Sequence, residues 1–348
     1  LLDLDPTLQT PLMIAFFTTL GFGASVSLLK RGGPQVAMFF VLATVFAVLQ
    51  NVVGVGVAVA LGLDPLFGLL AGSVTLTGGP ATGLAFAPLF EAQGVTGAAP
   101  VALAMAMAGI VAGALLGGPV SAWLVSRHKL DVKASPPAPK PDEPFASDDA
   151  ATVAVPAGED ETAETWAVMK NVVALLVAMW LGYYLSGWIE SRGHTMPAYI
   201  GAMVVAAVIR NVDDLTGWIG LSMRVLDLIG AIALSLFLAM ALMTLRLWEL
   251  SGLALPLVVA LVAQIVLIFL AVPLVFRFMG RDYEAAVMGG GFVGFMLGTT
   301  ANAMAVMRTL VERYGPAPRA FLVAPLVGAF FIDFTNALLI TAGLNFLR

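Results

Sequence analysis

The stretch Gly289 to Ala303 constrains the fold of this chain more than any other. It reads Gly-Gly-Gly-Phe-Val-Gly-Phe-Met-Leu-Gly-Thr-Thr-Ala-Asn-Ala and lies within an apolar region. In lipid, backbone that leaves the helical pattern must be covered by protein or line a polar cavity, because lipid offers no hydrogen-bond partners. A similar stretch, Thr75 to Gly83, lies in the first half of the chain. Two interrupted apolar segments in corresponding positions indicate the binding site of a transporter.

The composition indicates a membrane protein. Hydrophobic residues make up 60% of the chain and charged residues 11%, whereas soluble domains contain about 25% charged residues. Many apolar runs exceed the roughly 20 residues that a helix needs to span a bilayer, and they lack the alternating pattern of a membrane barrel. The sequence therefore predicts an all-α membrane protein. The absence of cysteine excludes thiolate metal sites, and the net charge of −5 implies no nucleic-acid partner.

A proline-rich and acidic stretch at residues 127–165 predicts a disordered linker between two membrane halves, residues 1–126 and 166–348. The apolar segments of the two halves align as a repeat. Each half has a span, a second span that carries Gln50 or Gln264, an interrupted stretch at about 65–90 or 284–311, and a last span. Segments 166–189 and 196–210 have no counterpart upstream, so we expect that two N-terminal helices are absent from this sequence.

The basic residues predict the topology, because short cytoplasmic loops carry an excess of lysine and arginine. If both interrupted stretches are re-entrant hairpins and the linker is cytoplasmic, fourteen basic residues fall inside and three outside. The same topology makes the repeats inverted, with the 65–90 hairpin entering from outside and the 284–311 hairpin from inside. Two hairpins that meet near the midplane are typical of alternating access.

The hairpin tips are the predicted substrate site, because helix N-termini there offer N–H groups to a carboxylate. Other interpretations remain open: the glycines also fit close helix packing, the threonines and the asparagine also fit helix caps, and the arginine also fits a side chain that reaches the membrane surface. The predicted substrate-binding residues are Thr77, Gly78, Gly79, Thr82, Gly298, Thr299, Thr300, Asn302 and Arg308.

Oxygen-bearing side chains inside apolar spans are candidate sodium ligands, because hard cations prefer oxygen donors. Asp333 is an acid in the middle of a long apolar span, where a carboxylate is costly and indicates a function, and Asn336 lies one turn further on. The amides of the second spans also fit interhelical hydrogen bonds. The predicted sodium ligands are Thr75, Gln50, Asn51, Gln264, Thr300, Asp333 and Asn336.

Several stretches resemble the bacterial sodium/glutamate symporter family, and the match runs over nearly all of the membrane part. They are Leu61 to Ser73, Leu236 to Met243, Leu247 to Leu250, Glu312 to Pro316 and Ala320 to Asp333. The resemblance implies sodium-coupled glutamate uptake across the bacterial inner membrane, a homodimer, two inverted five-helix halves with a re-entrant loop in each, and two helices before Leu1. The tips depart from the family pattern: Gly78-Gly-Pro-Ala-Thr82 replaces Gly-Gly-His-Gly-Thr, and Gly298-Thr-Thr-Ala301 replaces Gly-Ala-Thr-Pro.

The function predicted from the sequence is symport of sodium and glutamate by alternating access, with sodium as coupling ion and no cofactor. The chain is not expected to be an enzyme, because no serine, histidine or acid set is placed as nucleophile, base and orienter. The alternatives are the same architecture with another carboxylate or an amino acid as substrate, or with proton coupling. A channel is disfavoured, since the sequence has no ring of charges and no aligned carbonyl filter.

Overall fold

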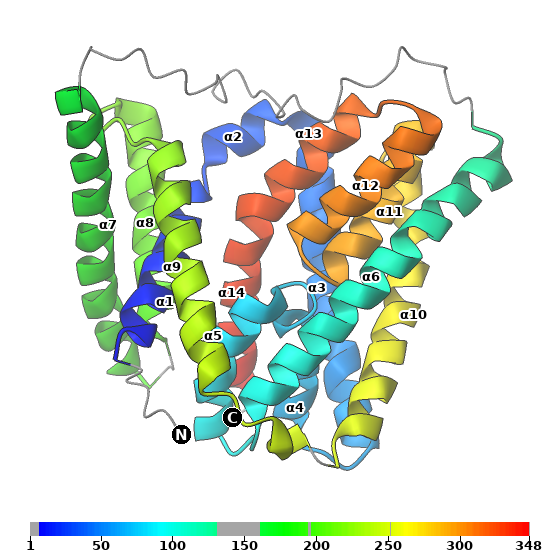
Figure 1. Ribbon diagram of the computed structural model, residues 1–348, viewed down its shortest axis with the longest axis horizontal. Helices are drawn as coiled ribbons and strands as arrows, with labels where there is room; N and C mark the ends of the chain where they lie inside the picture. Colours follow the sequence, from blue (N-terminus) through cyan, green and yellow to red (C-terminus); the bar gives the residue numbers. More distant parts are fainter. Residues whose placement is uncertain (1–6, 131–160, 194–195, 251, 348) are drawn as a thin grey trace.

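The computed structural model describes residues 7–130, 161–193, 196–250 and 252–347 (Figure 1). Within these ranges every regular element is a helix. Most of the predicted linker at 127–165 lies outside them: α6 (Ala98–His128) precedes the gap and α7 (Glu161–Glu190) follows it. Five described helices are long and apolar enough to span a membrane, so the chain is a helical membrane protein: Gly33–Ala60, Ala98–His128, Thr165–Glu190, Met223–Met243 and Ala254–Phe278.

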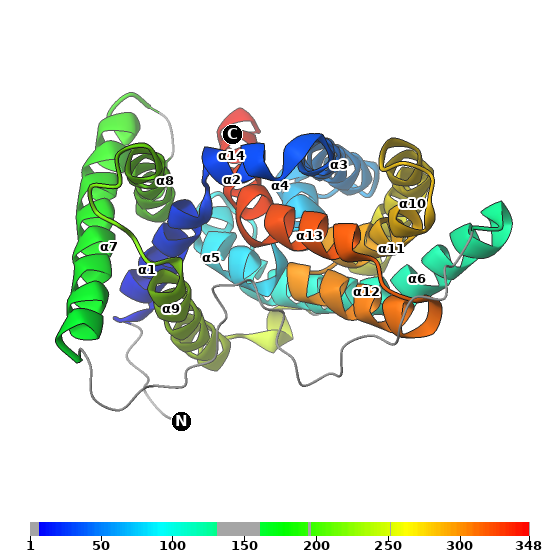
Figure 2. The same cartoon turned by 90° about the horizontal axis from the view of Figure 1, so that it is seen from above.

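One group of helices forms one side of the molecule (Figures 1 and 2). It contains α1 (Gln9–Gly23), α7, α8 (Ala198–Thr216) and α9 (Met223–Met243), which pack against one another. Glycines permit close backbone approach between these helices. A Cβ on Gly21 of α1 would overlap the carbonyl of Met203 in α8, and a Cβ on Gly182 of α7 would overlap the backbone of Ala202.

The second group contains two broken helix pairs held between long helices. The first pair is α4 (Pro65–Leu69) with the π-helical η1 (Leu70–Val74), followed by α5 (Gly79–Ala92); the second is α11 (Tyr283–Met296) and α12 (Thr300–Tyr314). Around them lie α3 (Gly33–Ala60), α6, α10 (Ala254–Phe278), α13 (Pro318–Leu326), η3 (Val327–Phe331) and α14 (Ile332–Phe346). Figure 1 shows the two pairs extending from opposite ends of the molecule toward its middle.

Local sequence sets where the pairs begin and break. Asp64 caps α4 by accepting a hydrogen bond from the Leu66 N–H at 2.8 Å, and Asp282 caps α11 through the Ala285 N–H at 2.8 Å. Such caps satisfy N–H groups that have no partner within the helix. Arg319 at the start of α13 donates to Asp282 Oδ2 at 2.7 Å, which ties the base of the second pair to the next helix. Gly72 has non-helical dihedral angles, φ −96° and ψ −131°, so the first pair is already broken before its tip.

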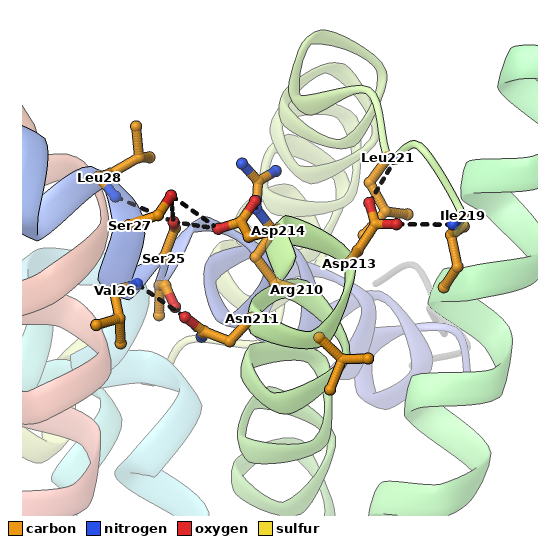
Figure 3. A network of polar contacts seen from close by, with 12 residues as sticks. Ser25, Val26, Ser27, Leu28, Arg210, Asn211, Asp213, Asp214, Ile219 and Leu221 are labelled. Carbon is orange, nitrogen blue, oxygen red and sulfur yellow. Dashed lines mark hydrogen bonds and ion pairs between the residues drawn. The ribbon is translucent and has the colours of Figure 1, made fainter. Parts of the chain in front are cut away.

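The first span predicted for the N-terminal half, at residues 8–29, is not one helix. It breaks at Ala24 and Ser25, and α2 (Val26–Arg31) turns away to lead into α3. The end of α8 holds this corner (Figure 3). Asn211 Oδ1 accepts from the Val26 N–H and Asn211 Nδ2 donates to the Ala24 carbonyl, both at 2.8 Å, while the Ser25 hydroxyl donates to Asp214.

An aromatic cluster joins the two groups of helices. The ring of Phe17 in α1 lies 4.9 Å from that of Tyr199 in α8, and the Tyr199 ring lies 5.2 Å from that of Phe86 in α5. All three side chains are buried. Aromatic pairs in such arrangements contribute about 0.5–1.5 kcal/mol beyond their area burial. The first broken pair therefore packs directly against the α1–α8 side of the molecule.

The corner between α1 and α2 gives a test of this assignment. Asn211→Leu removes the hydrogen bonds to the Val26 N–H and the Ala24 carbonyl, so we expect a loss of about 0.5–1.5 kcal/mol in stability for each bond and a lower apparent melting temperature in detergent. Ser27→Ala is the control, because the half-buried Ser27 hydroxyl bonds to the Ser25 hydroxyl at 3.1 Å and to Asp214 at 3.3 Å but does not bond to the Val26 N–H or the Ala24 carbonyl. Equal melting temperatures for the two variants would contradict a structural role for Asn211.

Candidate functional site

The tips of the two broken pairs touch. A Cβ on Gly79, the first residue of α5, would lie 2.9 Å from Thr299 Cγ2 and 3.9 Å from the Gly298 carbonyl oxygen. Gly79 also has φ +67°, a conformation that side-chain-bearing residues rarely adopt. Glycine is therefore required here both by the backbone angle and by the contact. The structure thus brings together Gly79, Gly298 and Thr299, which the sequence predicts as substrate-binding residues.

Gln50 of α3 bridges the two tips with one side chain. Its Oε1 accepts a hydrogen bond from the Thr77 hydroxyl at 2.6 Å, and its Nε2 donates to the carbonyl of Met296 at 2.7 Å. Thr77 belongs to the first tip and Met296 is the last residue of α11. Gln50 is fully buried and Thr77 is 3% exposed. The amide that was predicted as a sodium ligand therefore has both ends engaged in connecting the pairs.

Side chains from three other helices surround η1. Asn51 Oδ1 accepts from the Ser73 N–H at 2.9 Å, and Asn336 Nδ2 of α14 donates to the Ser73 carbonyl at 2.9 Å. Gln264 Nε2 of α10 donates to the Gln50 carbonyl at 2.8 Å, and the Thr75 hydroxyl donates to the Leu70 carbonyl at 2.9 Å. The bonds to Ser73 and Leu70 satisfy backbone groups that the broken helix leaves without partners, whereas Gln264 holds the adjacent turn of the unbroken α3.

Three buried oxygens around η1 have no hydrogen-bond partner in the described part of the chain. They are Ser73 Oγ, Gln264 Oε1 and Asn336 Oδ1, and all three residues are fully buried. An unsatisfied buried polar atom costs about 1–3 kcal/mol, and each one in a native structure needs an explanation. Two of these residues were predicted as sodium ligands. Ser73 was not, because a serine within an apolar run carries no signal of its own.

The second tip is ordered mainly by Asn302. Its Nδ2 donates to the carbonyls of Ile110 in α6 and Gly294 in α11, both at 3.1 Å, and its backbone N–H donates to Thr299 Oγ1 at 3.4 Å. Thr299 is therefore the N-cap of α12. Thr300 lies against Gly328, where a Cβ would overlap the Thr300 hydroxyl. The capping interpretation is confirmed for Thr299, and both threonines are only half-buried.

The glycines of α11 allow close packing, as one interpretation of the sequence proposed. A Cβ on Gly290 would lie 2.6 Å from the Gly117 carbonyl oxygen of α6, and one on Gly294 would lie 3.1 Å from Ala303 Cα of α12. The interval of four residues therefore keeps one face of α11 free of side chains. At the first tip, Gly78 packs on Thr82: a Cβ added to Gly78 would lie 2.6 Å from Thr82 Cβ.

Arg308 stands apart from the tips, and Asp333 makes no polar contact within the described residues. Arg308 is exposed and lies eight residues after Thr300 in α12, which corresponds to about 12 Å along the helix. Asp333 is half-buried at the start of α14, and it makes no hydrogen bond or ion pair with the residues that the structure describes. The structure therefore does not bring the Arg308 side chain to the tips.

The helix ends give the tips an uneven electrostatic environment. The N-termini of α5 and α12 begin at Gly79 and Thr300, while η1 and α11 end at Val74 and Met296. Helix N-termini favour anions and C-termini favour cations. Gly78 provides no side-chain cap for α5, so its first N–H groups remain available. Tips without a charged side chain can thus attract ions of both signs.

Comparisons with known proteins identify the family of this chain. The family model of the sodium/glutamate symporter matches residues 1–316. The sodium/glutamate symporter of Escherichia coli K12 is 39% identical over 340 residues, which is 97% of this chain and 82% of that protein. The sodium/glutamate symporter of Haemophilus influenzae is 36% identical over the same shares of both chains. No solved structure matches. The chain belongs to the sodium/glutamate symporter family.

Proposed function

We propose that this chain is a secondary active transporter that carries glutamate together with sodium across the membrane. Two sodium/glutamate symporters are 36–39% identical to this chain over nearly its whole length. The observation that carries the proposal is the contact between two helix breaks inside the protein, where Gln50 bridges Thr77 and Met296. Broken helices that meet in this way provide main-chain dipoles for ions within a membrane.

In this proposal the two broken pairs are re-entrant hairpins of two inverted repeats. The order of helices supports it: α3 precedes the first pair and α10 precedes the second, and the pairs extend from opposite ends of the molecule (Figure 1). Gln50 and Gln264, which the repeat aligns with each other, are in contact at 2.8 Å through the Gln50 carbonyl. The membrane is the inner membrane, with the linker at 127–165 in the cytoplasm.

Glutamate binds at the meeting tips. The free N–H groups at the start of α5 and the N-terminus of α12 receive its carboxylates, with Thr77, Thr82 and Thr300 as neighbouring hydroxyls. Gly78, Gly79, Gly298 and Thr299 form the backbone of this site, and Asn302 holds it in place. Arg308 is too far along α12 to contribute in the conformation described. The site therefore holds an anion through backbone dipoles and not through an arginine.

Sodium binds beside the tips and orders them. Among the predicted ligands, Gln264 and Asn336 have an oxygen without a partner, and Asp333 has a carboxylate without one in the described residues. Thr75, Thr300, Gln50 and Asn51 complete the candidates, although the Gln50 and Asn51 oxygens already accept hydrogen bonds. Because Ser73 and Thr77 belong to one break, an ion at η1 stabilises the tip that receives the anion.

Alternating access follows from the two groups of helices. We propose that α1, α7, α8 and α9 form the frame and that the remaining helices move against it with the bound ions. The transporter is a homodimer in this proposal, and α7 is the helix whose apolar surface supports it. Its large exposed aromatic side chains are available to lipid or to a second copy: Trp166, Trp180, Tyr183, Tyr184 and Trp188.

Sodium coupling predicts that glutamate uptake into proteoliposomes requires an inward sodium gradient. Uptake should fall to background when choline replaces external sodium, and a proton gradient alone should not restore it. An excess of unlabelled glutamate should abolish labelled uptake, while hydroxycarboxylates and neutral amino acids should compete weakly. Uptake driven by protons without sodium would favour the proton-coupled alternative. Strong competition by another carboxylate would indicate that this carboxylate, and not glutamate, is the substrate.

The bridge between the tips predicts that Thr77→Val lowers uptake at limiting glutamate by about tenfold, as expected for about 1.4 kcal/mol. Valine keeps the volume but leaves Gln50 Oε1 buried without its donor. Thr309→Val is the control, because Thr309 is exposed and bonds only to the Ala305 carbonyl of its own helix. If Thr77→Val and Thr309→Val transport equally well, the bridged tips are not the substrate site.

A further inference from the structure

We infer that Ser73 Oγ and Asn336 Oδ1 are ligands of one sodium ion at the break in η1. The inference rests on the proposed sodium coupling and adds to it a residue, Ser73, and a position. Both side chains are fully buried, and both oxygens lack a hydrogen-bond partner in the described ranges. The two residues are 263 positions apart in the chain, so only the fold brings them together.

The two oxygens belong to residues that are in direct contact. Asn336 Nδ2 donates to the Ser73 carbonyl at 2.9 Å, and the oxygen and nitrogen of one amide are about 2.2 Å apart. Asn336 Oδ1 is therefore within about 5 Å of the Ser73 carbonyl oxygen, and Ser73 Oγ belongs to that same residue. The third unpartnered oxygen, Gln264 Oε1, is fixed to Gln50 instead and is not part of the pair.

The surroundings favour a cation over an anion. Ser73 lies in the last turn of the α4–η1 element, and the C-terminal end of a helix carries a partial negative charge. Gly72 turns the backbone out of the helical pattern at the same point, and unwound carbonyls beside such breaks coordinate sodium in transporters. Asn336 Oδ1 can only accept hydrogen bonds or bind a cation. A hydroxyl and an amide oxygen are therefore matched to a positive ion.

The ligand chemistry also selects the kind of cation. Hard cations take hydroxyl, amide and carbonyl oxygens. No group of three or more histidine, cysteine or acidic side chains that could hold a metal ion is found among the described residues. Uncharged ligands suit a single charge better than a divalent ion, and neither oxygen gains a proton at physiological pH. The pair therefore suits a monovalent cation such as sodium and cannot itself carry a proton.

The position of the ion explains how its binding would affect the substrate site. The Ser73 carbonyl accepts from the Gly78 N–H at 2.9 Å as well as from Asn336. Gly78 directly precedes Gly79, which contacts Thr299 in the other tip. An ion held by Ser73 and Asn336 thus fixes the segment that positions the first N–H groups of α5. Sodium binding and anion binding are linked through five residues of backbone.

The test is sodium binding by the purified full chain in detergent, measured as the thermal shift on titration with sodium chloride against choline chloride, without glutamate. Ser73→Ala should raise the sodium concentration for half of the shift by about tenfold, the effect of about 1.4 kcal/mol on a dissociation constant. Thr44→Val is the matched control, because Thr44 Oγ1 is also a buried hydroxyl without a partner but lies elsewhere, on α3. It should bind sodium like the unchanged protein.

Asn336→Asp separates a ligand role from a structural one. Aspartate keeps an oxygen in the place of Oδ1 but loses the donor to the Ser73 carbonyl, so a ligand role predicts that Asn336→Asp still binds sodium. Asn336→Leu has no oxygen at this position and should weaken sodium binding as much as Ser73→Ala does. Sodium affinity unchanged in both Ser73→Ala and Asn336→Leu would overturn the site. If the unchanged protein shows sodium-driven glutamate uptake in that case, the proposed function stands and only the position of the ion is wrong.

Discussion

The requirement that a broken helix inside a membrane must find partners for its backbone determines the rest of this structure. Each freed N–H and carbonyl at η1 and at the tips needs a hydrogen bond from protein, since lipid supplies none. The partners come from α3 and α14 as the amides of Gln50, Asn51 and Asn336, and Gln264 of α10 in turn donates to the Gln50 carbonyl. Because Gln50 reaches both the Thr77 hydroxyl and the Met296 carbonyl, α3 packs against both breaks and the two tips come into contact.

The sequence predicted the broken elements well, because glycine and threonine gathered in an apolar region indicate backbone that leaves the helical pattern. It identified both interrupted stretches and the amides of α3 and α10. It did not predict the corner at Ala24 and Ser25, since two serines in an apolar run fit a helix as well as a break. The partners that decide it, Asn211 and Asp214, are nearly two hundred residues away.

The roles of individual residues were harder to predict than their location. Gln50 was expected either to ligate sodium or to make interhelical hydrogen bonds, and in the structure its two ends connect Thr77 to Met296. Asn302 was expected to contact substrate, and it holds α12 to α6 and α11. An amide has two donors and an acceptor in one plane, so composition cannot distinguish a ligand from a bridge. Only the list of partners, which depends on the whole fold, separates the two.

The tips carry no charged side chain, and this has a physical advantage for a transporter. A charged group moved through a low-dielectric interior pays a large desolvation cost in every state in which its partner ion is absent. Helix dipoles and amide oxygens stabilise ions while remaining inexpensive to bury when the site is empty, since most of them keep their hydrogen bonds within the protein. Tips without a charged side chain can therefore release the anion on the far side, and the few oxygens without a partner in the described residues, such as Ser73 Oγ and Asn336 Oδ1, favour rebinding of the cation.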